Sequence, residues 1–133
     1  MKTSYRSSVT ITGDKEIINN LKKEVDKLVF AGLIAVNNGL VELEKGAKRD
    51  CPVNTDPEDT DTIHLKESIY IEPAKKYKKT IVGRVRVRKS TAMHVEFGTS
   101  KMDMRPFLRQ QIYLNKDKIR KSARDIIKGA LGL

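Results

Sequence analysis

The clearest strand signal in the chain lies at residues 80–88, which read TIVGRVRVR. Apolar residues and one glycine alternate there with mainly basic residues: Ile81, Gly83, Val85 and Val87 against Val82, Arg84, Arg86 and Arg88. Successive side chains of a strand point to opposite faces, so one face can enter a core while three guanidinium groups leave it together. The stretch therefore predicts a strand with one buried and one basic face.

Two other extended segments are expected beside this strand. An apolar segment with Leu65, Ile69 and Ile71 predicts a strand that ends at Pro73, and the basic residues 75–79 join it to the next strand as a hairpin. Downstream, residues 93–97 alternate again, and Gly98 then supplies a turn that tolerates positive φ. Together the three segments predict a small antiparallel sheet.

A long amphipathic helix is expected upstream, from about Lys15 to Arg49. Asp14 is a candidate N-cap, and Pro52 stops the helix. The apolar residues recur at helical spacing: Ile17, Leu21, Val25, Leu28, Val36, Leu40, Leu43 and Ala47.

Three glycines of this helix, Gly32, Gly39 and Gly46, fall seven residues apart, close to one stripe on its surface. Each costs about 0.5–1 kcal/mol relative to alanine inside a helix. The simplest reason to keep a bare stripe is the close approach of another backbone. The alternative is a kink, or a helix that ends before Asn37-Asn38-Gly39.

A second helix is expected from about Arg105 to Lys128, with Pro106 in its first turn, where the missing N–H costs nothing. The element order predicts an α+β fold, in which the long N-terminal helix and the C-terminal helix pack on one face of a small antiparallel sheet. A chain of 133 residues fits a single domain, 1–133, with a strand or arm at 1–13 and an acidic loop at 53–63.

Composition limits the core and the location of the protein. The core is expected to be aliphatic, because Trp is absent and aromatic residues make up 5% of the chain. The longest uncharged stretch, 28–41, is too short to span a bilayer, and the N-terminus lacks the apolar region of a signal peptide, so we expect a soluble protein made in the cytoplasm without membrane contact. The single Cys51 is expected as a small packed residue at a helix end.

The net charge of +10 is unevenly distributed. Residues 75–89 hold eight Lys or Arg and no acid, and residues 105–133 hold eight against two acids, whereas residues 50–74 hold seven acids against one Lys. Such asymmetry favours a polyanion partner or head-to-tail contact between copies of the chain; a merely solvated basic surface is the alternative. The candidate subunit contacts are the loop acids Asp56, Glu58, Asp59 and Asp61, whose spacing does not match a calcium loop.

The sequence contains no recognisable catalytic constellation. His64 and His94 lie apart, without ligand-spaced partners or a nucleophile motif, and no glycine-rich phosphate loop follows a strand. We therefore expect no enzyme, cofactor or metal. The row Arg84, Arg86 and Arg88 is a candidate contact for a protein partner or for DNA phosphates, and without interleaved aromatic residues it is not expected to stack bases.

Three short segments carry a family resemblance. They are a PV-x-T turn with Pro52, Val53 and Thr55, a VEFGT turn with Glu96, Phe97, Gly98 and Thr99, and a PFL helix start with Pro106, Phe107 and Leu108. In this order they resemble the neck or tail-completion (head–tail joining) proteins of long-tailed bacteriophages, over residues from about 33 to 130. The family usually places Gly and then Leu-Arg after the first turn, whereas here Asp56 follows and about eight residues are inserted.

The resemblance implies a structural virion protein, made in the host bacterial cytoplasm, whose copies form a ring at the junction of capsid and tail. A hexameric ring, adjoining neck and tail proteins as partners, and non-specific contact with genomic DNA in the channel are what it implies further. For Phe97, Phe107 and Pro106 we expect a role in holding the sheet against the last helix. Glu96 is expected either to accept backbone N–H groups of the following loop or to pair with Arg105. The alternatives are a non-specific nucleic-acid-binding protein outside a virion and an enzyme of unrecognised type.

Overall fold

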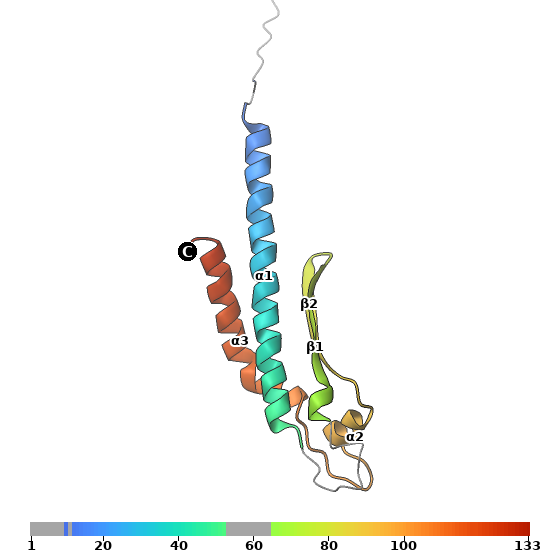
Figure 1. Ribbon diagram of the computed structural model, residues 1–133. Coiled ribbons are helices and arrows are strands. Elements are labelled where there is room, and N and C mark those ends of the chain that lie inside the picture. The colour runs from blue at the N-terminus through green and yellow to red at the C-terminus, as the bar shows by residue number, and fades with distance from the viewer. Residues whose placement is uncertain (1–9, 11, 53–64) are drawn as a thin grey trace, which may run out of the picture.

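The computed structural model describes residues 10, 12–52 and 65–133. Its elements are α1 (Asp14–Asp50), a short 3-10 helix η1 (Lys66–Ser68), β1 (Ile69–Tyr77), β2 (Thr80–Val87), α2 (Thr91–Phe97) and α3 (Arg109–Ala130). In Figure 1, α1 lies between the β1–β2 hairpin and α3, and it contacts both strands of the hairpin as well as α3. The predicted α+β fold is confirmed: both helices lie on the same side of an antiparallel hairpin.

The helix α1 is continuous over 37 residues. The alternative of a break near Asn37 is therefore wrong. The Asn37 side chain instead holds the hairpin, because its Oδ1 accepts a hydrogen bond from the Ala74 N–H at 2.8 Å. The N-terminal cap is Gly13, at φ 90°, and the expected cap Asp14 is the first helical residue.

The hairpin follows the predicted alternation but not the predicted boundary. β1 begins at Ile69, after η1, so Leu65 lies outside the strand in which it was expected. The strand continues past Pro73 to Tyr77, and the ladder is irregular between Glu72 and Lys75. An irregular ladder accommodates a proline, which has no N–H to donate. In β2, alternate residues from Ile81 to Val87 are partly buried and those between them, Arg84 and Arg86 included, are exposed, as expected.

The predicted third strand is wrong. Residues 91–97 form the helix α2, so the sheet of the described chain has two strands. A strand would place Val95 and Phe97 on one face, whereas the structure buries the sequence neighbours Val95 and Glu96 and leaves Phe97 56% exposed. A short apolar run suits a strand or a helix, and its periodicity alone does not separate them.

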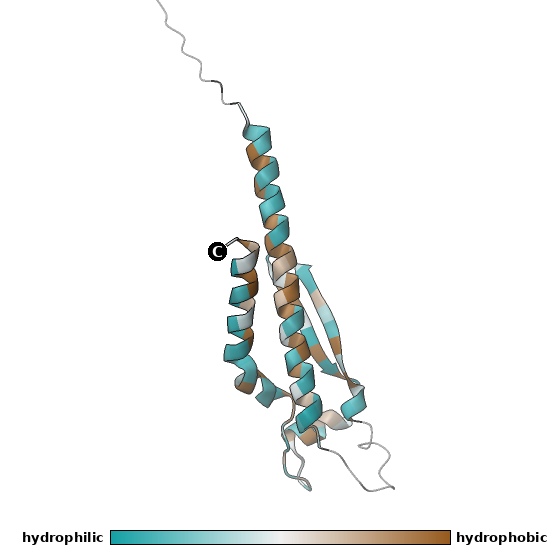
Figure 2. Ribbon diagram, turned by 60° about the vertical axis from the view of Figure 1, so that its left-hand side comes forward, coloured by the Kyte–Doolittle hydropathy of each residue, from teal (hydrophilic) through white to brown (hydrophobic). Residues whose placement is uncertain are grey.

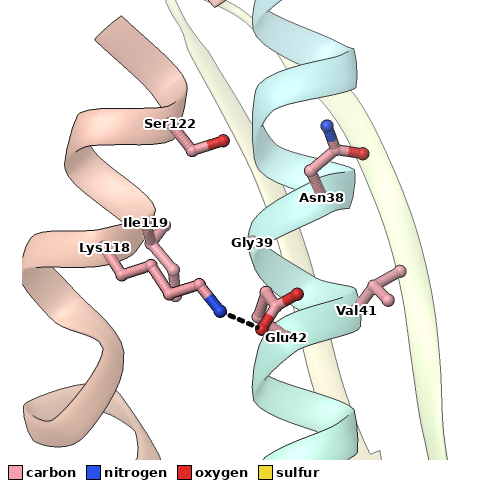
Figure 3. A pocket seen from close by; sticks show the side chains of 7 residues that line it. All are labelled: Asn38, Gly39, Val41, Glu42, Lys118, Ile119 and Ser122. Atoms are coloured by element: carbon pink, nitrogen blue, oxygen red, sulfur yellow. Dashed lines mark hydrogen bonds and ion pairs between the residues drawn. The ribbon is translucent and has the colours of Figure 1, made fainter. Parts of the chain in front are cut away.

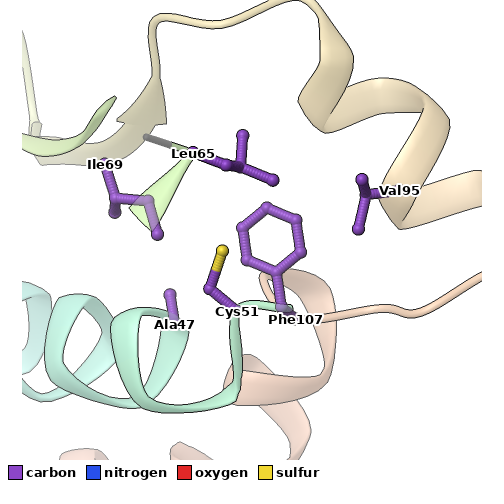
Figure 4. Packing of buried hydrophobic residues seen from close by; sticks show 6 residues of the cluster. All are labelled: Ala47, Cys51, Leu65, Ile69, Val95 and Phe107. Carbon is purple, nitrogen blue, oxygen red and sulfur yellow. The ribbon is translucent and has the colours of Figure 1, made fainter. Parts of the chain in front are cut away.

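The main core closes the lower end of the molecule as seen in Figure 1. Figure 4 shows its six residues, which come from the end of α1, the start of the hairpin, α2 and the approach to α3: Ala47, Cys51, Leu65, Ile69, Val95 and Phe107. Cys51 is buried at the end of α1, as predicted, and this burial raises the pKa of its thiol. The other core residues are aliphatic, apart from the fully buried ring of Phe107.

The three glycines of α1 face side chains, so the expectation of a closely approaching backbone is wrong. A Cβ at Gly32 would lie 2.5 Å from Ile81 Cδ1 of β2, and one at Gly39 would lie 2.9 Å from Ile119 Cγ2 of α3. A Cβ at Gly46 would overlap the side chain of Gln111. The stripe thus makes room for the hairpin at one position and for α3 at the other two.

Gln111 occupies this room as a fully buried polar residue. Its Nε2 donates a hydrogen bond to Asp50 Oδ2 at 2.5 Å, and its Oε1 accepts one from Asn115 Nδ2 at 3.3 Å. Hydrogen bonds from Arg49 and Gln111 lower the pKa of Asp50 to about 2. The contact between α3 and the end of α1 is therefore partly polar, and the buried Gln111 side chain forms hydrogen bonds through both its amide nitrogen and its amide oxygen.

Substitution of Gly39 tests how closely the two helices fit. We expect Gly39→Leu to lower the free energy of unfolding by about 1–3 kcal/mol through overpacking, and Gly39→Ala to lower it less, both measured by urea unfolding. The control is Gly129→Ala in α3, where a Cβ would meet nothing within 4 Å and should stabilise by about 0.5–1 kcal/mol.

A second background identifies the clashing group. In Ile119→Ala, where the methyl group nearest Gly39 is gone, Gly39→Ala should become stabilising. If Gly39→Ala raises the melting temperature of the unaltered chain and Gly39→Leu does no harm, the glycine is not part of a tight helix contact.

Candidate interaction surfaces

Glu96 links α2 to the start of α3. Its Oε2 accepts hydrogen bonds from the N–H groups of Phe107 at 3.0 Å and Leu108 at 3.1 Å, and its Oε1 accepts one from the N–H of Arg109 at 2.8 Å. The first N–H groups of a helix have no partner within the helix and attract negative charge. Glu96 therefore caps α3 from a separate element.

The two expectations for Glu96 have different outcomes. The predicted acceptance of backbone N–H groups is confirmed, but the charged partner is Arg109, whose Nε lies 3.2 Å from Oε1, and not Arg105. The Arg105 N–H donates to the Val95 carbonyl at 2.8 Å. Burial by itself raises the pKa of Glu96, but the three N–H groups and the Arg109 guanidinium outweigh it and lower the pKa below its ordinary value.

The turn after α2 requires its glycine. Gly98 has φ 75°, and a Cβ there would lie 2.8 Å from the backbone nitrogen of Met104 and 3.0 Å from the carbonyl oxygen of Met102. Thr99 then closes the loop, because its N–H donates to the same Met102 oxygen at 2.8 Å. These contacts explain Gly98 and Thr99 of the motif as structural residues.

The aromatic residues of the motif differ in role. Phe107 is buried in the core, whereas Phe97 is exposed beneath the Arg109 guanidinium, 4.2 Å from the ring centroid. The expectation that Phe97 holds the sheet against the last helix is therefore wrong. Pro106 and Leu108 precede α3, which begins at Arg109 and not near Arg105 as predicted. The N–H groups just before the helix bind Glu96 instead.

Part of the predicted site lies outside the described residues. From the first motif turn, only Pro52, which is half-buried after α1, can be placed. The remaining positions outside the description are Val53, Thr55, Asp56, Glu58, Asp59, Asp61, His64 and the arm at 1–9 and 11.

The arginine row lies on the outer face of the hairpin and is partly neutralised. Arg84 and Arg86 both reach Glu72 Oε2 of β1, at 3.4 and 3.3 Å. Arg88, one residue beyond β2, has its guanidinium 4.7 Å from the centre of the Tyr70 ring. Sequence reasoning missed Glu72, whose position opposite Arg84 depends on the hairpin register.

An uncovered apolar face on α1 was also missed. In Figure 1 the N-terminal part of α1 extends beyond both α3 and the hairpin, and Figure 2 shows hydrophobic residues along it. Ile17, Leu21 and Val25 are each more than half exposed. Four-residue spacing places them on one face of the helix. Sequence periodicity identified this face but could not show that no described element covers it.

The hollow between α1 and α3 shows no arrangement of side chains suited to catalysis or metal binding among the described residues. Figure 3 shows its lining, with the Lys118 Nζ–Glu42 Oε2 ion pair at 2.9 Å beside Gly39 and Ile119. Its volume is about 250 Å³. Among residues 10, 12–52 and 65–133, no three His, Cys, Asp or Glu side chains gather to hold a metal ion. No helix in these same ranges is long and apolar enough to cross a membrane.

Acid unfolding tests the role of Glu96. At pH 7 we expect Glu96→Gln to lower the free energy of unfolding by about 1.5–3 kcal/mol, the range for hydrogen bonds to a charged group. Because the folded pKa of Glu96 lies below the ordinary value of 4.5, its contribution is complete above that pH and is lost as the pH falls through the folded pKa. In urea titrations, the difference in unfolding free energy between wild type and variant should therefore shrink as the pH falls below 4.5.

The matched control is Glu42→Gln. Glu42 also has a lowered pKa, through its hydrogen bond and charge interaction with Lys118, but it is exposed and binds one side chain. Exposed ion pairs contribute little, so this variant should unfold almost like wild type. Equal costs for the two variants at pH 7, or a cost for Glu96→Gln that does not shrink as the pH is lowered below 4.5, would contradict the capping role.

Comparison with known proteins leaves the family unassigned. No protein-family model, curated protein or solved structure matches this chain. The resemblance to neck and tail-completion proteins therefore rests on the three motif segments.

Proposed function

We propose that this protein is a structural component of a tailed-phage virion, not an enzyme, and that its copies form a hexameric ring at the head–tail junction. The ring would complete the neck or tail and join it to the capsid. Two motif segments that suggested the family, 95–99 and 106–108, meet in space through the Glu96 carboxylate. This arrangement gives the motif residues a structural role.

The observation that carries the proposal is the uncovered face of α1. Around Ala31, Ala35 and Gly39 this helix is buried between the hairpin and α3. Toward the N-terminus the same face continues with Val25 and Leu21, which are 53% and 61% exposed. Val25 borders a hollow beside the tip of the hairpin. Extended apolar faces of this kind are typical of interaction sites. A subunit that meets a neighbouring copy on assembly would have a use for it.

A ring requires two different contact surfaces on each subunit. Heterologous contacts close into a ring when the rotation between copies closes. The apolar face of α1 is one such surface, and the opposite signs of residues 50–74 and 75–89 favour a second, electrostatic contact. The four loop acids remain proposed subunit contacts.

The second candidate function, nucleic-acid binding outside a virion, is favoured by the net charge of +10. It does not explain the uncovered apolar face, because a phosphate backbone is recognised by charge and hydrogen bonding. We therefore place it second.

A double substitution tests assembly. We expect the wild-type protein to associate with increasing concentration in sedimentation velocity, and Leu21→Glu with Val25→Glu to remain monomeric, because charge on the contact face opposes its burial. Phage that carry this variant should accumulate filled heads without tails.

The matched control is Asn19→Glu with Asn20→Glu, which adds the same charge to the same helical segment but outside the row formed by Ile17, Leu21 and Val25. It should associate like wild type and support normal particles. Normal joining of heads and tails by the Leu21 and Val25 variant would overturn the proposal, as would equal behaviour of the two variants.

A further inference from the structure

We propose that the outer side of α3 binds the phosphate backbone of duplex DNA without reading its sequence. The residues that would do so recur every four positions and are all exposed: Lys116, Arg120, Arg124 and Lys128. Spacing by four residues along an α-helix corresponds to about 6 Å. The four cations, called the α3 basic row below, thus extend over about 18 Å of the helix.

The packing of α3 fixes where this row lies. Gln111 and Ile119 point toward α1, as their contacts with Gly46 and Gly39 show. With 3.6 residues per turn, Arg124 falls on nearly the opposite side of the helix, and Arg120 and Lys128 flank it. The row therefore points away from the body of the protein, and Figure 2 shows mainly hydrophilic residues along α3.

The charges of the row have no acidic partner among the described residues. Two other cations of α3, Arg109 and Lys118, are held by Glu96 and Glu42. Within the described ranges, no member of the row forms an ion pair. The two acids of α3, Asp117 and Asp125, stand three residues before Arg120 and Lys128, but within the described part of the chain neither forms an ion pair with them. Like charges four residues apart destabilise a helix, so an external anion would relieve a cost built into the sequence.

Charge balance favours an external polyanion over another copy of the chain. Each chain carries 27 Lys and Arg against 17 Asp and Glu. If every acid in an assembly found a basic partner, a surplus of 10 cations per copy would remain. The acidic loop of a neighbour can therefore neutralise only part of the basic surface.

Duplex DNA fits the row better than single-stranded nucleic acid. Single-strand surfaces interleave basic residues with aromatic rings that stack bases. The exposed aromatic residue of α3, Tyr113, lies before the row and not within it. The arginine row of the hairpin is expected to bind phosphates more weakly than the α3 basic row, because Arg84 and Arg86 already share the carboxylate of Glu72. Binding of DNA by the isolated protein does not depend on the proposed ring.

The test compares two variants with equal loss of charge. In the first, the four residues of the α3 basic row are changed to Gln, which retains helix propensity. In the control, the four exposed lysines of the projecting part of α1 are changed to Gln: Lys15, Lys22, Lys23 and Lys27. Binding of a fluorescent 30-base-pair duplex of arbitrary sequence is measured by anisotropy from 50 to 200 mM salt, with circular dichroism to verify folding.

We expect salt-dependent binding by wild type and by the control. The α3 variant should bind at least tenfold more weakly at the lowest salt, and its plot of log K against log salt should flatten by about 0.9 for each phosphate that the protein no longer neutralises. Absence of duplex binding by wild type, or equal weakening in both variants, would overturn the proposal. Retained DNA binding together with impaired self-association would also overturn it, and would assign the row to an acidic segment of another copy.

Discussion

The hydrogen bonds of the Glu96 carboxylate hold together α2, the start of α3 and the main core between them. The carboxylate binds three successive N–H groups at the start of α3 and the side chain of Arg109. Through these bonds α2 fixes where α3 begins, and the segment just before α3 places Phe107 in the core. A buried carboxylate without these donors would be strongly disfavoured, so the motif residues around it are mutually dependent.

The rest of the architecture is organised around α1. Glycines on this helix admit side chains from the hairpin and from α3, and Asn37 binds the irregular point of β1. One helix thus serves as the common packing surface for two elements that each contribute little core of their own. This arrangement explains why α1 lies between them and why its helix tolerates residues of low intrinsic propensity.

Sequence periodicity was sufficient for the elements whose pattern is long. The helix α1 and the buried face of β2 were predicted because each repeats its pattern over many residues. The short segment 91–97 was assigned wrongly, since seven residues do not distinguish a strand from a helix. Glu72 lies opposite Arg84 because of the hairpin register, and Gln111 lies against Gly46 because of the packing of the two helices. A single-sequence pattern contains neither kind of information. Glu96 was identified from its motif, but its donors became clear only with the fold.

The free end of α1 has a consequence for the timing of assembly. Isolated helical segments shorter than about 12–15 residues are marginally stable in water, and the part of α1 before Val25 is such a segment. In an unassembled subunit this end should open and close locally long before the core unfolds. Contact with a neighbour would then have to order the helix as well as cover it, and this ordering lowers the affinity between free subunits. Assembly is therefore favoured on a template that already holds neighbouring subunits in place.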